Sequence, residues 1–428
     1  MKIEKKLWII LFAFGIFAIC FSGWIFRQST AREKLFWDNT IRCETKELKE
    51  GEIKSENIAL PEDFDVPKSI LFKTTHTIAE VWLDGEKIYE YGNEADAPGF
   101  MKTPGSCWHI VDIPGDSSGK NLEVRIIPVY EGYYGNEVSL VYGTRGDCIL
   151  KILTDCLGIL VISCGILFAA VICILLYCGA ARRKRSDKTE AKIEIFLNLG
   201  FFSLLVAVWT LVQCGFLQFL IPDGRTLYFV EYFSLFLFPV PFNFLLYDIC
   251  KSRYHKGALI FSILYLTNMA VDVLLQCTGI IDMSRLLSVI HVIMVANVVY
   301  TVVIILYEAG KKENDVAQKF RYPMCVVMGF GMAEMIFYYL RRFEQISILL
   351  SMGTMLFIIM LIWIQVSQYY DQYIQKQKVI YLQKIANMDM LTEAMNRNAY
   401  EDMVKYLDEG EIKLSTTGVV VFDLDDLK

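Results

Sequence analysis

The residues best suited to chemistry stand at the end of the sequence, in residues 418–428. A short apolar run leads directly into Asp423, and Asp425, Asp426 and Lys428 follow. A buried strand that ends at carboxylates offers hard oxygen ligands, which suit Mg²⁺ together with phosphate groups. A lysine beside them complements the charge of a triphosphate. The pattern predicts a strand whose end contributes to a magnesium and nucleotide site.

A second motif precedes this strand. Residues 389–400 read Asp-Met-Leu-Thr-Glu-Ala-Met-Asn-Arg-Asn-Ala-Tyr. Taken with the Asp-rich strand end, this run resembles the opening of a GGDEF diguanylate cyclase domain, whose pattern is D-x-L-T-G-L-x-N-R-x-A-[FY]. Glu393 and Ala394 depart from the pattern, because the family has Gly and Leu there. The resemblance implies the start of an α/β catalytic domain.

The resemblance also implies roles for single residues. Asp423 and the carbonyl of Leu424 would bind Mg²⁺, and Lys428 would contact the phosphates of GTP. An intact domain of this family joins two GTP molecules into cyclic di-GMP. The printed sequence stops at Lys428, before the GGDEF loop, so no catalytic set is complete in it. We therefore expect an incomplete domain over residues 389–428 and no cyclase activity from the chain as given.

Long apolar stretches must position these groups. A helix that crosses a bilayer needs about 20 apolar residues, and the chain is 54% hydrophobic with a mean hydropathy of +0.39. We expect a seven-helix transmembrane block over residues 151–367. Residues 7–26, which follow three lysines, read as an uncleaved signal anchor within residues 1–27. The seven spans are expected at residues 153–179, 193–214, 226–248, 257–276, 284–308, 323–340 and 345–367.

Basic residues indicate the orientation of the helices, because Lys and Arg favour cytoplasmic loops. Every second loop between the expected spans is rich in Lys and Arg, for example residues 182–185, and these loops are assigned to the cytoplasm. Arg341 and Arg342 are an exception, because they fall in the last outer turn. This places residues 28–150 outside and both termini in the cytoplasm. With the family resemblances, it predicts a multi-pass protein of the bacterial cytoplasmic membrane.

The segment outside the membrane is predicted to be all-β. Residues 69–76, 77–83 and 86–91 are rich in β-branched and aromatic residues, and Asp84-Gly85 is a hairpin signal. Apolar and polar residues alternate over residues 122–126, so one face is buried. Residues 32–147 hold 13 Lys and Arg against 22 Asp and Glu, a net charge of −9 that argues against a nucleic-acid partner. We expect a β-sandwich or jelly roll.

Two runs of this segment are distinctive: residues 81–92, and residues 104–109 with Ile113-Pro114. They resemble the galactose-binding-type jelly roll that precedes the seven helices of bacterial seven-transmembrane sensors with diverse intracellular signalling modules. The resemblance implies a ligand-sensing domain, with carbohydrate among the possible ligands. Aromatic rings can stack on such a ligand, or they can simply pack in the core. The candidates are Trp82, Tyr89, Tyr91, Trp108 and His109.

Four ionisable residues fall inside the expected spans, where such groups are costly: Glu231, Asp272, His291 and Glu334. One hypothesis is an outward-facing polar cup that couples the outer domain to the helices. The alternative is that they are interfacial. A disulfide between Cys43 and Cys148 is also left open, and no Cys or His spacing predicts a zinc site.

A linker helix is expected after the last span, over residues 368–388. Val366, Tyr373 and Ile380 recur every seven residues, the spacing of a coiled-coil seam, which favours a parallel homodimer. We expect a membrane receptor that regulates a diguanylate cyclase. One alternative is a non-enzymatic receptor with an inert or docking C-terminal segment. A transporter is less favoured, because the sequence shows no internal repeat of the kind that transporters use.

Overall fold

The computed structural model describes residues 41–43, 53–60, 68–93, 97–130, 138–184, 194–311, 313–340, 347–389 and 394–408, together with Thr392, Gly418 and Val420. The expected signal anchor and the residues predicted to bind metal and phosphate, Asp423, Leu424 and Lys428, lie outside the described residues. The chain divides into two compact units, Met1–Leu361 and Ile362–Lys428.

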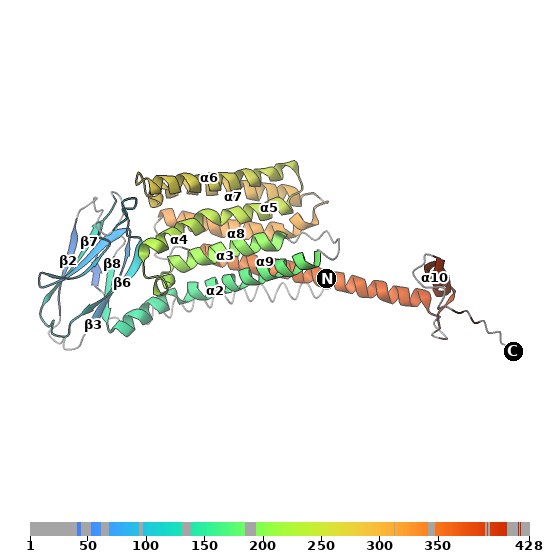
Figure 1. Cartoon of the computed structure of the whole chain (residues 1–428), viewed down its shortest axis with the longest axis horizontal. Coiled ribbons are helices and arrows are strands. Elements are labelled where there is room, and N and C mark those ends of the chain that lie inside the picture. Colours follow the sequence, from blue (N-terminus) through green and yellow to red (C-terminus); the bar gives the residue numbers. More distant parts are fainter. Residues whose placement is uncertain are drawn as a thin grey trace. The chain divides into compact units, whose positions relative to one another are not determined.

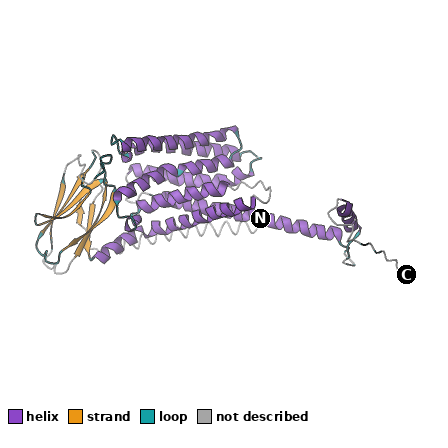
Figure 2. Ribbon diagram, in the orientation of Figure 1, coloured by secondary structure: helices purple, strands orange, loops and turns teal. Residues whose placement is uncertain are grey.

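The described part before the first apolar helix consists of two four-stranded sheets (Figures 1 and 2). Their strand orders are β1-β8-β3-β6 and β2-β7-β4-β5, and all neighbouring strands are antiparallel. The strands are β1 Ile41–Cys43, β2 Lys54–Ala59, β3 Lys68–Thr75, β4 Thr77–Leu83, β5 Glu86–Tyr91, β6 Ser106–Ile113, β7 Asn121–Pro128 and β8 Val138–Gly143.

The two sheets share one hydrophobic core, so they form a β-sandwich. In β4 and β7 every second residue is buried, as alternation in a half-buried strand requires. The core takes Phe72 and Val111 from one sheet and Val81 and Val124 from the other. Each fully buried side chain of this kind contributes about 1.5–3 kcal/mol. The expected two-sheet architecture is confirmed, whereas the relation to the jelly-roll family stays a prediction.

The hairpin expected at Asp84-Gly85 is confirmed. Both residues have positive φ, 46° and 85°, which is the geometry of a two-residue type I′ turn. β4 ends at Leu83, directly before this turn, and β5 begins at Glu86, directly after it. Aspartate and glycine tolerate this backbone better than other residues do, so the local sequence fixes the register of the hairpin.

Six of the helices in the described residues are long and apolar enough to cross a membrane, which indicates a multi-pass membrane protein. The seventh expected span corresponds to Ile348–Ile364, the apolar beginning of α9, which is shorter than the other six. A seventh crossing therefore stays a prediction. The helices are α2 Arg145–Lys184, α3 Glu194–Gln213, α4 Gly224–Leu237, α5 Pro239–Ile249, α6 Lys256–Cys277, α7 Leu287–Ala309, α8 Asp315–Leu340, α9 Ile348–Asn387 and α10 Arg397–Asp408.

The third span is not the single helix that the sequence predicted over residues 226–248. It breaks at Phe238 into α4 and α5, and Pro239 is the first residue of α5. Proline lacks the N–H that a continuous helix needs and its ring clashes with the preceding turn. The break therefore follows from Pro239 and Pro241, although the two halves together still form one candidate span.

The outer face of the sheet β1-β8-β3-β6 packs on helix α2. Leu71 from β3 and Val141 from β8 join Cys148 and Ile152 of α2 in a second apolar cluster. The middle of β3 is therefore buried on both faces. The Cys148 thiol donates to the carbonyl of Ser69 at 3.6 Å and forms no disulfide, so the bridge considered from the sequence is not present.

The second unit contains the end of α9, a turn and α10. The helix expected over residues 368–388 is confirmed, because α9 continues to Asn387. Asp389 Oδ1 accepts hydrogen bonds from the N–H and hydroxyl of Thr392, both at 3.0 Å. Asn396 Oδ1 accepts from the N–H of Ala399 at 3.2 Å and caps α10. These residues of the GGDEF-like run thus shape a turn.

Candidate functional site

The clearest concentration of buried polar groups lies where the sandwich meets one end of the helices. Its centre is Gln276, in the last turn of α6, which is fully buried. The Gln276 amide donates to the carbonyl of Phe100 at 2.7 Å and to Asp282 Oδ1 at 2.6 Å. Its oxygen accepts from the hydroxyl of Tyr228 at 3.1 Å and from the N–H of Met283 at 3.0 Å. One side chain therefore joins a sandwich loop to α4, α6 and the α6–α7 connection.

Tyr130 reaches the same network from the sandwich. Its hydroxyl donates to the second carboxylate oxygen of Asp282. The guanidinium of Arg285 lies over the Tyr130 ring, 5.6 Å from its centroid, and burial raises the pKa of the phenol. Because Asp282 accepts from both Tyr130 and Gln276, its buried charge is stabilised by hydrogen bonds from two parts of the molecule. The N–H of Ser284 donates to the hydroxyl of Tyr228 at 3.0 Å. We refer to Phe100, Tyr130, Tyr228, Gln276, Asp282 and Ser284 as the junction network.

His76 lies at the edge of this network, at the corner where the chain passes from β3 in one sheet to β4 in the other. It has φ 53°, which is rare for a residue other than glycine. Its ring packs against Tyr228 of α4 and Tyr130, with centroids 5.8 and 6.2 Å apart. Nδ1 lies 2.8 Å from the Thr103 hydroxyl. Burial lowers the pKa of His76 to about 4, partly opposed by the charge of Asp282, so the ring is neutral at pH 7.

Further contacts hold the sandwich on the helices. Gln218, in the connection after α3, accepts from the N–H of Trp108 at 2.7 Å and donates to its carbonyl at 2.6 Å. Gly105 has φ 86°, and a Cβ there would overlap the carbonyl of Gly224 at the start of α4. Both glycines are therefore required by the close approach of two backbones.

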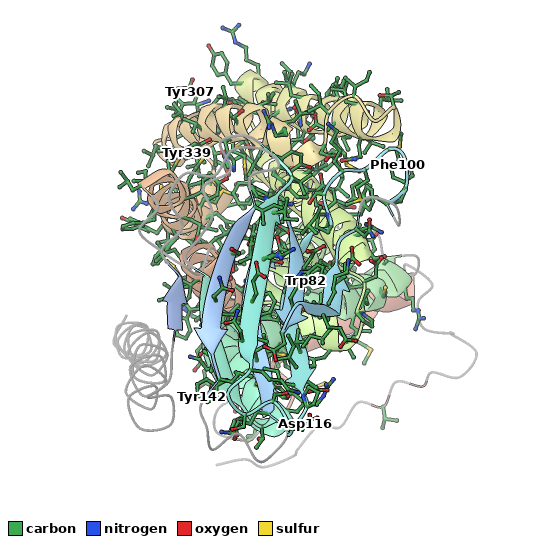
Figure 3. All side chains as sticks on the ribbon, turned by 90° about the vertical axis from the view of Figure 1, so that its left-hand side faces the viewer. Trp82, Phe100, Asp116, Tyr142, Tyr307 and Tyr339 are labelled. Carbon is green, nitrogen blue, oxygen red and sulfur yellow. The ribbon has the colours of Figure 1, made fainter. Side chains whose placement is uncertain are left out.

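The aromatic residues proposed to line a carbohydrate site do not converge. Trp108 packs in the cluster with α2, whereas Trp82 lies on the outer face of the other sheet (Figure 3). The Trp82 ring has the Arg125 guanidinium 4.4 Å and the Lys87 ammonium 5.6 Å from its centroid. Of the candidates, the structure brings His109 together with Tyr89 and Tyr91.

His109 points into the sandwich, and both its ring nitrogens have partners. Nε2 lies 2.6 Å from the Thr74 hydroxyl and Nδ1 lies 2.9 Å from the Tyr89 hydroxyl. Burial lowers the pKa of His109 to about 3 and raises that of Tyr89 to about 12. The rings of Tyr91 and His109 are 4.8 Å apart. These neutral, fully bonded groups are arranged as core packing rather than as an open binding site.

The four ionisable residues of the expected spans each bond to different groups. Glu231 accepts from Gln213 at 2.8 Å, and Asp272 accepts from Asn268 of its own helix at 2.7 Å. Among the described residues, no hydrogen bond joins any of the four to another, so a shared polar cup is not observed. His291 Nδ1 lies 2.9 Å from the Tyr339 hydroxyl. Glu334 accepts hydrogen bonds from the N–H groups of Ser347 and Leu350 at 2.6 and 2.9 Å.

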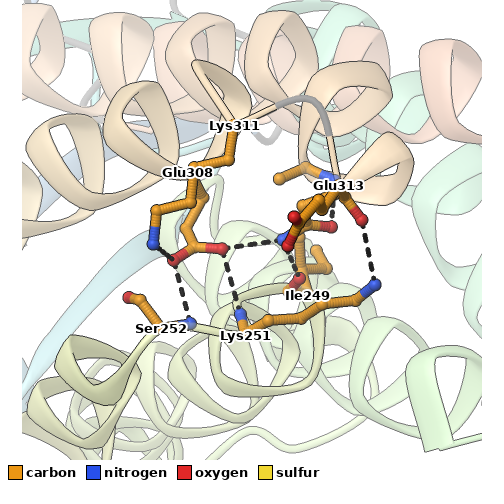
Figure 4. A network of polar contacts seen from close by, with 8 residues as sticks. Ile249, Lys251, Ser252, Glu308, Lys311 and Glu313 are labelled. Carbon is orange, nitrogen blue, oxygen red and sulfur yellow. Dashed lines mark hydrogen bonds and ion pairs between the residues drawn. The ribbon is translucent and has the colours of Figure 1, made fainter.

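A polar centre that the sequence did not predict lies at the other end of the helices (Figure 4). Glu308, at the end of α7, is fully buried. Its carboxylate accepts from the N–H groups of Lys251 and Ser252 at 3.1 and 2.9 Å and from the Asn314 amide at 2.8 Å. Asn314 also donates to the carbonyl of Ile249 at 3.1 Å. Glu308 therefore ties the α5–α6 turn to the α7–α8 turn.

Sequence reasoning missed Glu308, Gln276 and Asp282 because the first two stand at predicted span ends and the third in the loop between two spans, where polar residues are ordinary. The only available signal is weak: Asn314 and Gln276 are amides beside short loops.

A third polar contact, between Asn243 of α5 and Asn297 of α7, is reciprocal, with distances of 2.9 and 3.2 Å. Buried amide pairs of this kind specify which helices are neighbours.

Among the described residues, no group of three or more His, Cys, Asp or Glu could hold a metal ion. Comparisons of the chain with protein-family models, with curated proteins and with solved structures found no match.

Proposed function

We propose that this chain is a membrane signal receptor in which the β-sandwich senses a ligand and the helices respond. The observation that carries the proposal is the junction network. Gln276 and Asp282 are buried and bonded both to the sandwich and to the helix ends. A buried polar group that loses its partner costs about 1–3 kcal/mol. A shift of the sandwich must therefore move the ends of α4, α6 and α7 with it or break these bonds.

The proposed output is cyclic di-GMP synthesis by an intact diguanylate cyclase domain. The support is the resemblance of residues 389–400 and 418–428 to the start of that domain. In it Asp423 and the Leu424 carbonyl would bind Mg²⁺, and Lys428 would contact GTP. The turn at Asp389, closed by Thr392, is compatible with a structural role for the first motif.

The proposed receptor acts as a homodimer through α9, because two GTP sites must face each other in that reaction. Tyr373 and Ile380 are one heptad apart and are both exposed in the single chain. The family resemblance of the sandwich supports membership of the bacterial seven-transmembrane sensors. It also supports a place in the cytoplasmic membrane with both termini inside, and carbohydrate as a first ligand class to test.

The proposal can be tested by extending the chain in frame past Lys428 with the remainder of a GGDEF domain. Cyclic di-GMP is then measured in cells that lack other cyclases. Asp423→Ala should abolish the product, because a metal ligand is lost. Gln276→Met keeps the volume of the side chain but removes its hydrogen bonds, and should change the output several-fold. Lys102→Gln, exposed close to Phe100 in the same loop, is the control and should have no effect.

The two arms separate the two parts of the proposal. Full activity of Asp423→Ala would contradict the metal assignment. An output unchanged in Gln276→Met, at an expression level equal to that of the wild type, would contradict coupling through the junction network.

A further inference from the structure

Two cations and two tyrosines form a row on the end of the helices opposite the sandwich. The Arg253 guanidinium lies over the ring of Tyr254, 5.0 Å from its centroid, and donates to its hydroxyl at 3.1 Å. The rings of Tyr254 and Tyr307 meet edge to face, 5.9 Å apart. The Lys311 ammonium lies 4.5 Å from the centroid of Tyr307. We call Arg253, Tyr254, Tyr307 and Lys311 the cation–tyrosine row.

The row is fixed in place although it is exposed. The hydroxyl of Tyr300, on α7, donates to the carbonyl of Tyr254 at 2.6 Å and ties the start of α6 to α7. Lys311 follows the end of α7, next to the Glu308 centre. Tyr254 and Tyr307 nevertheless remain 50% and 48% exposed. A surface whose backbone is held and whose rings are open can bind a partner with little loss of conformational entropy.

The charge of the row is only partly balanced within the chain. Arg253 forms no ion pair with a carboxylate among the described residues. Lys311 lies 3.7 Å from Glu308 Oε1. That carboxylate also accepts hydrogen bonds from the N–H groups of Lys251 and Ser252 and from the Asn314 amide. The row is therefore positive at Arg253, where the cation has no carboxylate partner among the described residues, which suits an anionic ligand.

An apolar surface adjoins the row and indicates the kind of anion. One face of α6 and one face of α7 expose large aliphatic side chains at helical spacing, as surfaces in contact with lipid tails do. Tyrosine rings at the end of such a face are typical of the boundary between tails and headgroups. The exposed residues nearest to the row are Ile260, Ile263 and Leu264 of α6, and Val299, Val303 and Leu306 of α7.

We propose that the cation–tyrosine row is a binding site for the headgroup of an anionic phospholipid. The phosphate would lie between Arg253 and Lys311, with the tyrosine hydroxyls as further donors, and the acyl chains would lie along the exposed faces of α6 and α7. A soluble phosphate compound would use the same cations but would leave the aliphatic surface uncovered. This inference is independent of the proposed receptor function, because it holds for either orientation of the helices and for any output domain.

The site can be tested with the full chain in nanodiscs that contain equal amounts of phosphatidylcholine and phosphatidylglycerol. After release into detergent, native mass spectrometry measures how much phosphatidylglycerol stays bound. Arg253→Gln and Lys311→Gln should each weaken retention about fivefold, the effect of one cation near an anionic surface. Lys319→Gln removes an exposed lysine of α8 outside the row and should leave retention unchanged.

Arg253→Gln is the decisive variant, because Arg253 does not contact the Glu308 centre and its loss should leave the fold intact. Retention equal to wild type in this variant would overturn the proposal. An equal loss in Lys319→Gln would also overturn it, since general surface charge would then explain binding. Displacement of the lipid by glycerol 3-phosphate at matched concentration would show that the anion site recognises soluble phosphate instead, and would overturn the lipid assignment.

Discussion

The hydroxyl of Tyr130, in the sandwich, donates a hydrogen bond to the carboxylate of Asp282, which is 152 residues away in the connection between α6 and α7. Both residues are buried. Gln276 donates to the other oxygen of the same carboxylate at 2.6 Å. A side chain of the sandwich and a side chain of the helices therefore bond to the same buried carboxylate, and neither can move far without the other.

Replacing Tyr130 by Phe should destabilise the protein by about 1.5–3 kcal/mol, because hydrogen bonds to charged groups lie in this range. The ring and its packing contacts stay in place, and the variant loses the donor to Asp282 and a long contact, 3.5 Å, from the Ser284 hydroxyl. Unfolding of the purified protein in nanodiscs, followed by heat or denaturant, measures the effect. Tyr373→Phe, exposed on α9, is the matched control and should unfold like the wild type. Equal stability of both variants would mean that the Tyr130–Asp282 bond contributes nothing.

Gly105→Ala should loosen the sandwich from the helices. A Cβ at Gly105 would overlap the backbone of Gly224, and the φ of 86° is itself unfavourable for alanine. Hydrogen exchange should therefore rise in the loop around Thr103 and at the start of α4. Gly99→Ala is the control, because a Cβ there meets nothing within 4 Å. A wild-type exchange pattern in Gly105→Ala would argue against this close approach.

Acid should weaken the junction through His76. Its pKa is lowered from 6.5 to about 4 by burial, so the unfolded chain binds this proton more readily than the folded protein does. Stability is then fully present above pH 6.5 and falls as the pH drops to about 4, by about 3 kcal/mol for this residue. His109 adds a similar loss of stability with falling pH, since burial lowers its pKa to about 3.

His76→Asn separates the contribution of His76, because asparagine tolerates the positive φ but does not titrate. Melting temperatures measured from pH 7.5 to pH 4.5 should fall less steeply in this variant than in the wild type. Parallel curves would show that His76 does not contribute to the acid sensitivity.

Glu308→Gln should destabilise the other end of the helices by about 1.5–3 kcal/mol. The amide keeps the shape of the side chain but puts an NH₂ group where the carboxylate accepts from Lys251, Ser252 or Asn314. Glu313→Gln is the control, because the contact of Glu313 with Lys251 uses its backbone carbonyl. Thermal unfolding of both variants decides the point, and an unchanged Glu308→Gln protein would contradict the role assigned to this centre.

The orientation proposed for the chain predicts a labelling pattern in intact cells. A membrane-impermeant maleimide should reach a cysteine placed at Ser118, which is exposed in a turn of the sandwich. It should not reach a cysteine at Ser186, which follows α2 in the sequence and is predicted to face the cytoplasm. Twelve native cysteines require a background in which the accessible ones are replaced. The reverse pattern would overturn the topology.

Local patterns were sufficient for much of the fold. Aspartate and glycine at residues 84 and 85 predicted the β4–β5 hairpin, and alternation over residues 122–126 predicted the buried face of β7. These features depend on neighbours in the chain, which a sequence displays directly. The buried second face of β3 could not be predicted in this way, because Leu71 is covered by α2, a partner distant in sequence.

By itself, the sequence determined the β-sheet segment and the apolar helices of membrane-spanning length, because hydrophobic periodicity and run length are local properties. It could not decide which polar groups meet. Trp82 and Trp108 looked like one site but lie on different sheets, whereas Tyr130, Gln276 and Asp282 gave no pattern and form one network. Only the tertiary structure decides such pairings, because a buried carboxylate or amide takes its partners from whichever segments the fold brings within hydrogen-bond distance.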